Sequence, residues 1–201
     1  IYRDIAAHGH NSAVYYPGGS FVELPPRNNY VLDKLVPLAH QAGLLDPNIP
    51  CLLLGGIPGD LEGDDLIKAV RWLQDECRKQ GWPEMIVFGW DEPPFPSRSD
   101  EVRRSLAPMR GIPMRVNIDM SGSPAVYGYS TPGLCDVLTV MGEGVLSPEM
   151  RAEAERMGAA LWTYSYATWR EGFDPLRQRY FAGLFTWAHE LGGNWIWAYH
   201  H

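Results

Sequence analysis

The stretch VLTVMGEGVLSPEMRAEAERMGAALWTY, residues 137–164, holds a complete strand–helix–strand unit. Its ends, 137–140 and 160–164, are short apolar runs of the kind that form strands buried on both faces of a parallel sheet. Between them, Ser147 can cap a helix that starts at Pro148, and Gly158 can end it. The stretch therefore predicts α/β architecture.

The same alternation continues along the chain. Helices are predicted at 29–41 with a kink at Pro37, at 64–80 ending before Gly81, and from 174 to 191, with shorter ones near 3–8 and 99–109. In the helix after residue 174, the expected buried stripe is Leu176, Tyr180, Leu184, Trp187 and Leu191. Apolar runs at 13–16, 51–54, 85–88, 114–118 and 195–198 raise the number of strand candidates to seven.

This alternation fits either an open doubly wound sheet or a closed (β/α)8 barrel. We expect the barrel, because polar and aromatic residues follow nearly every strand and because the chain opens on a helix, as though one strand preceded it. The expected fold is an irregular or truncated TIM-type barrel with seven visible strands. Residues 1–201 would form a single domain, part of a larger parent chain.

Composition excludes several classes of protein. The chain has 201 residues, 24 acidic and 17 basic, which gives a formal net charge of −7. A negative chain without a basic cluster is a poor partner for nucleic acid. No apolar run is long enough to span a bilayer, and an odd number of cysteines, 3, cannot form a complete disulfide framework. His8 and His10 lack a third ligand at useful spacing, so we expect no metal and no cofactor.

Candidate site residues gather where the predicted strands end, since parallel strands bring their carboxyl ends to one edge. The set combines carboxylates, aromatic rings and one amide, as a sugar-cleaving site requires. The substrate-binding candidates are Trp90, Asn117, Asp119, Glu143, Tyr164, Tyr166, Trp197 and Tyr199.

The two catalytic candidates are Asp91 and Glu92, within Gly89-Trp90-Asp91-Glu92-Pro93. Neighbouring carboxylates repel, which favours one protonated acid beside one ionised acid, the pair that glycosidic cleavage needs. Successive strand residues point to opposite faces, so a twist at this strand end would be needed to aim both at one substrate. The alternative interpretation is a solvated acidic turn before proline.

This motif resembles the Asp-Glu motif of glycoside hydrolase family 123, the exo-β-N-acetylgalactosaminidases, and of related bacterial glycosidase-like domains. The stretch His8-Gly9-His10-Asn11 and the ending from Asp174 to Trp197 resemble those domains in layout. The resemblance implies a carbohydrate substrate and a periplasmic or secreted setting.

The resemblance also implies a substrate-assisted retaining mechanism on a β-linked, N-acetylated hexosamine. Glu92 would be the general acid and then the base, and Asp91 would orient the acetamido group. From their places at the rim, Tyr164 or Tyr166 would bond the acetamido oxygen and Trp197 would lie under the sugar ring. Two alternatives stay open: a two-carboxylate glycosidase that pairs Glu92 with Asp119 or Glu143, and a non-catalytic barrel module that binds carbohydrate or protein.

Overall fold

A computed structural model describes residues 1–7, 9–10, 31–49, 51–53, 63–90, 100, 103–104, 107, 115–120, 132–165, 176 and 180–196. The chain divides into two compact units. The first comprises Ile1–Gly89 and Pro108–Val116, and the second comprises Trp90–Ala107 and Asn117–His201.

The described residues of the first unit form helices and two paired strands. In chain order these are α1 (Tyr2–Ala7), the π-helical turn η1 (Val31–Leu35), α2 (Val36–Gln41), β1 (Cys51–Leu53), α3 (Gly63–Gln80) and β2 (Met85–Trp90), whose last residue falls in the second unit. Strands β1 and β2 pair in parallel, with Cys51 opposite Met85 and Leu53 opposite Val87. The predicted strands at 51–54 and 85–88 are therefore confirmed.

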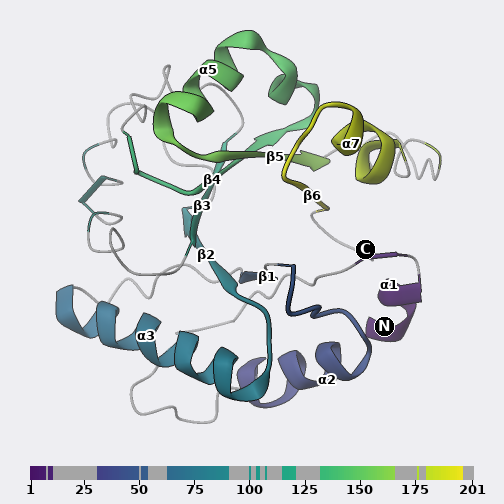
Figure 1. Ribbon diagram of the computed structural model, residues 1–201, viewed down its shortest axis with the longest axis vertical. Coiled ribbons are helices and arrows are strands. Elements are labelled where there is room, and N and C mark those ends of the chain that lie inside the picture. The colour runs from purple at the N-terminus through teal and green to yellow at the C-terminus, as the bar shows by residue number, and fades with distance from the viewer. Residues whose placement is uncertain are drawn as a thin grey trace. The chain divides into compact units, whose positions relative to one another are not determined.

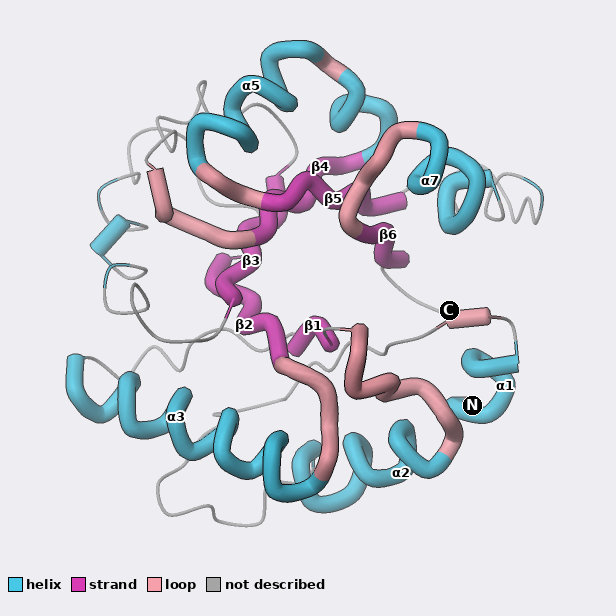
Figure 2. The backbone as a smooth tube through the Cα atoms, in the orientation of Figure 1, coloured by secondary structure: helices cyan, strands magenta, loops and turns pink. Residues whose placement is uncertain are grey.

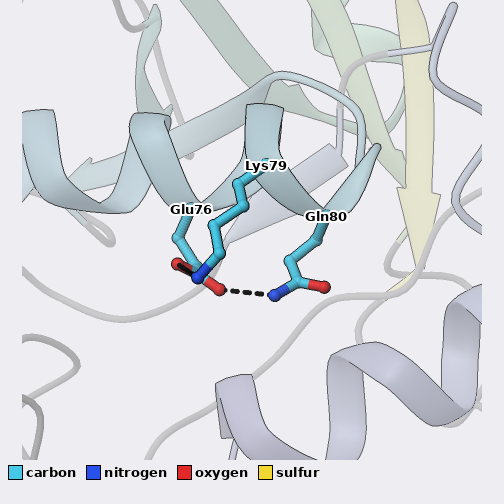
Figure 3. A network of polar contacts seen from close by, with 3 residues as sticks. All are labelled: Glu76, Lys79 and Gln80. Atoms are coloured by element: carbon cyan, nitrogen blue, oxygen red, sulfur yellow. Dashed lines mark hydrogen bonds and ion pairs between the residues drawn. The ribbon is translucent and has the colours of Figure 1, made fainter.

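Helix α3 is amphipathic, as its apolar spacing predicts. Val70, Leu73 and Cys77 are buried, and their spacing of three and then four residues places them on one face of the helix. The helix stops at Gly81, whose φ of 69° is the left-handed conformation that glycine adopts without strain. On the exposed face, Glu76 accepts hydrogen bonds from Lys79 Nζ at 3.5 Å and from Gln80 Nε2 at 2.7 Å (Figure 3). These surface pairs contribute little stability, so burial of the apolar face is what holds the helix in place.

The described residues of the second unit form four parallel strands. They are β3 (Arg115–Met120, from Asn117 on), β4 (Val137–Met141), β5 (Ala160–Ser165) and β6 (Gly193–Ile196), each paired with the next. Between β4 and β5 lie the 3-10 turn η4 (Gly142–Leu146) and helix α5 (Pro148–Met157). The π-helical turn η5 (Tyr180–Phe185) and the short helix α7 (Thr186–Ala188) precede β6. Figure 1 shows α5 and α7 beside β4, β5 and β6.

The crossover from β4 to β5 forms as its sequence predicts. Ser147 Oγ accepts a hydrogen bond from the Met150 backbone N–H at 3.0 Å, Pro148 occupies the first turn, and Gly158 ends α5 with φ 73°. The Arg151 guanidinium donates to the His189 carbonyl at 2.9 Å and so ties α5 to the turn after α7. The core of this unit includes Leu138, Val140 and Phe185, all almost fully buried.

The predicted (β/α)8 barrel is wrong. Within the described residues there are six strands, not eight: β1 pairs with β2 in the first unit, β3 to β6 pair in chain order in the second, and neither set closes on itself (Figure 2). Closing a barrel requires a matched number, tilt and stagger of strands, and apolar runs encode none of these. The expected strand at 13–16 lies outside the described residues.

One local prediction is also corrected. In the expected buried stripe, Leu176, Tyr180, Leu184 and Trp187 are exposed, and Trp187 is the most exposed at 78%; Leu191 alone is buried. Apolar periodicity shows that a helix has an apolar face, but only the packing decides whether that face is covered. Pro37 lies in the first turn of α2, directly after the π-helical turn η1, where the missing N–H of proline costs least; the predicted kink at this position stays a prediction.

Candidate functional site

The candidate site residues that the structure describes all lie in the second unit. Trp90 is the last residue of β2, Asn117 and Asp119 lie in β3, Glu143 lies in η4 and Tyr164 lies in β5. The predicted catalytic pair, Asp91 and Glu92, lies outside the described residues, and so do Tyr166, Trp197 and Tyr199. For Trp90, Asn117, Asp119 and Glu143, the backbone position alone is described.

Strand register brings several of these positions to the same level of the sheet. Asp119 pairs with Thr139, Thr139 with Trp162, and Trp162 with Gly193. Asp119 and Trp162 are thus separated by one intervening strand, which corresponds to roughly 10 Å between their backbones. Two residues nearer the carboxyl ends of the strands, Met141 pairs with Tyr164, and Tyr164 pairs with Trp195.

Tyr164 is buried, with 6% of its surface exposed. Its partner across the ladder, Met141, comes directly before η4, the turn that contains Glu143. Tyr164 therefore lies level with the carboxyl end of β4, at the edge where the candidate residues were expected to gather.

Turn η4 covers one face of this sheet. Thr163 Oγ donates toward the Gly142 carbonyl at 3.2 Å, and a Cβ on Gly144 would lie 3.7 Å from the Val140 side chain. Val140 and Thr163 occupy one row, and the next member of that row, Asn194, has both amide atoms buried without a hydrogen-bond partner. Side chains alternate along a strand, so Trp162 and Tyr164 lie on the face opposite to Thr163.

Trp162 has a support that the sequence pattern did not reveal. A Cβ on Gly192 would come 2.5 Å from Nε1 of Trp162, and a Cβ on Gly193 would come 2.9 Å from Cδ2. The diglycine therefore leaves the space in which the indole lies. Trp162 and Tyr164 belong to an aromatic run whose alternation predicts a stacking surface or core filling, but the contact of Trp162 with the diglycine depends on the register of β5 and β6.

The last strand starts earlier than predicted. Within the described residues it covers Gly193–Ile196, whereas the sequence predicts a start at 195, and the Gly192 N–H donates to the Leu161 carbonyl at 2.9 Å, which aligns the diglycine with β5.

The ionisable groups on the described residues provide neither a reactive thiol nor a metal site. Burial is the main cause that raises the pKa of the Cys135 thiol, to about 12, and the nearby charge of Asp136 raises it further. A thiol held protonated in this way is a poor nucleophile.

Among the described residues, no group of three or more His, Cys, Asp or Glu side chains could hold a metal ion. No helix in the described ranges is both long and apolar enough to cross a membrane.

Comparison with known proteins adds no assignment: neither a protein-family model nor a curated protein matches this chain.

Proposed function

We propose that the chain is a glycoside hydrolase that acts on a β-linked, N-acetylated hexosamine. The observation that carries the proposal is the segment Trp90-Asp91-Glu92-Pro93, which begins at the last residue of β2. In open parallel sheets, ligands bind beyond the carboxyl ends of the strands. The proposal therefore needs no closed barrel, only two acids that follow a buried parallel strand.

The proposed mechanism uses the acetamido group of the substrate as the nucleophile. Glu92 donates a proton to the leaving oxygen and then takes one from the attacking water, and Asp91 orients the acetamido nitrogen. The carbonyl oxygen of the acetamido group attacks the anomeric carbon, which forms an oxazoline and retains the configuration after hydrolysis. No enzyme nucleophile is needed, which is a known exception to the two-carboxylate pattern.

A two-carboxylate mechanism is the competing account of the same site. Glu92 would then act with Asp119 in β3 or with Glu143 in η4. The separation of the two carboxyl groups would decide between nucleophilic attack and activation of a water.

The test is hydrolysis of nitrophenyl β-glycosides by the wild type and by Glu92→Gln. Loss of a general acid is expected to lower turnover by about 100- to 10,000-fold. The control is Glu155→Gln, which neutralises an exposed acid on α5 and should leave turnover unchanged. The substrates are N-acetylgalactosaminide, N-acetylglucosaminide, galactoside and glucoside.

The pattern of substrates separates the mechanisms. Turnover confined to the two N-acetylated sugars and lost in Glu92→Gln supports substrate assistance. Turnover of the plain galactoside or glucoside favours the two-carboxylate account and directs the next substitutions to Asp119 and Glu143. If the folded wild type hydrolyses none of the four, the hydrolase proposal fails, and a module that binds carbohydrate or protein becomes the better account.

A further inference from the structure

Asn194, the second residue of β6, carries a buried side-chain amide. It pairs in register with Thr163 of β5. Both polar atoms of the amide, the acceptor Oδ1 and the donor Nδ2, are buried, and neither has a hydrogen-bond partner among the described residues. A buried polar group without a partner costs free energy, so native structures satisfy nearly all such groups with protein atoms or with ordered water.

The surroundings of this amide are polar. Residues paired across neighbouring strands carry their side chains on the same face of a sheet, so the side chains of Asn194 and Thr163 are neighbours. Thr163 is completely buried, and its hydroxyl donates toward the Gly142 carbonyl at 3.2 Å. The lone pairs of the hydroxyl and the second lone pair of the carbonyl can each accept a further hydrogen bond. A small polar molecule beside Asn194 would therefore find partners on the protein.

The amide of Asn194 and the hydroxyl of Thr163 are close but do not bond directly. Neighbouring strands lie about 4.8 Å apart, which brings polar groups on paired residues into the same small region. No hydrogen bond joins the two side chains, because the amide atoms have no partner. Polar groups that lie slightly too far apart for a direct bond are commonly joined by one water molecule.

The two amide atoms decide which kind of ligand fits. Oδ1 needs a hydrogen-bond donor, and Nδ2 needs an acceptor. A metal cation would bind Oδ1 but would leave the amide protons without an acceptor, and an anion would do the opposite. Water is both donor and acceptor, and buried waters make about three hydrogen bonds to polar groups that lack other partners.

We propose that Asn194 and Thr163 bind an ordered internal water on the face of the sheet that η4 covers. The water bonds the amide and the hydroxyl, and it thereby connects β6 to the Gly142 carbonyl in η4. Glu143 directly follows Gly142, so the same bonds hold the turn that contains this candidate acid. The proposal does not depend on the proposed function.

NMR of the isotope-labelled wild-type protein tests the site without a substitution. The side-chain amide protons of Asn194 should show a cross-peak to water that has the sign of the diagonal in a NOESY spectrum and the opposite sign in a ROESY spectrum. This pair of signs identifies a long-lived bound water, because proton exchange keeps the diagonal sign in both. Asn48 is the internal control: it is exposed, its amide donates to Asp46 at 3.0 Å, and it should show no long-lived water.

Two variants on the same row of the sheet give the energetic test. Asn194→Leu replaces the amide by an apolar side chain of similar shape, and Thr163→Val does the same for a hydroxyl that has a protein partner. If water satisfies the amide, both variants lose a hydrogen bond, and their equilibrium constants for unfolding in urea should rise by about 2- to 10-fold. If the amide is left unsatisfied, Asn194→Leu removes an unfavourable group, and its constant should fall by about tenfold instead.

Either measurement can overturn the water site. It is overturned if Asn194 shows no more contact with long-lived water than Asn48 does. It is also overturned if Asn194→Leu unfolds no more readily than the wild type, while Thr163→Val is destabilised as expected. If Asn194→Leu does not fold, the NMR spectra of the wild type decide alone. Neither experiment measures hydrolysis, so both results are separate from the test of the hydrolase.

Discussion

Substitution of Gly193 by alanine should destabilise the protein through a steric clash with Trp162. The new Cβ would lie 2.9 Å from Cδ2 and 3.0 Å from both Cε2 and Cε3, whereas ordinary van der Waals contacts begin at 3.4 Å. The indole would have to retreat by about half an ångström, since a shift of that size restores normal contact. Gly193 does not have a positive φ, so the backbone itself accepts alanine.

The size of the effect follows from two opposed contributions. Overpacking of this kind costs about 1–3 kcal/mol. Replacing glycine by alanine in a strand returns about 0.5–1 kcal/mol, because the unfolded chain loses flexibility. The net loss is therefore about 1–2 kcal/mol, which for a chain of this length lowers the Tm by roughly 2–8 °C.

The assay is urea denaturation followed by circular dichroism, together with a thermal melt. Gly183→Ala is the matched control, because a Cβ at Gly183 meets no atom within 4 Å. It should be neutral or slightly stabilising. A double-mutant cycle with Trp162→Ala isolates the clash, since Gly193→Ala should cost much less once the indole is gone. If Gly193→Ala were as stable as the wild type, or equally harmful without Trp162, the packing argument would be refuted.

Two further predictions concern α5 and the buried thiol. Ser147→Ala removes the side chain that accepts from the Met150 N–H, and it should lower stability by about 1 kcal/mol in a thermal melt, whereas Ser147→Asp should retain the cap. The pKa of Cys135 is raised by burial from 9.0 to about 12, so the folded chain keeps a proton that the unfolded chain loses. The free energy of unfolding should therefore fall as the pH rises from about 9 toward 12, and Cys135→Ala should show a shallower decline in urea titrations across that interval.

Local features of the fold were predictable because their causes are local. The ends of α5 depend on hydrogen bonds of Ser147 and on the conformation of Gly158, all within a few residues. The strands β1, β2, β4 and β5 coincide with apolar runs, because a strand buried on both faces must be apolar throughout. The candidate catalytic pair, Asp91 and Glu92, likewise rests on two adjacent residues of the sequence. It stays a prediction because it lies outside the described residues.

The sequence by itself therefore determined where helices and parallel strands form and where most of them end. Only the tertiary structure decided that the sheet is open, that Leu184 and Trp187 are exposed, and that Asp119 shares a row with Trp162. It also decided that Trp162 lies on Gly192 and Gly193, about 30 residues along the chain. The physical reason is that register and packing join residues distant in sequence, whose contacts no local pattern of apolar and polar residues records.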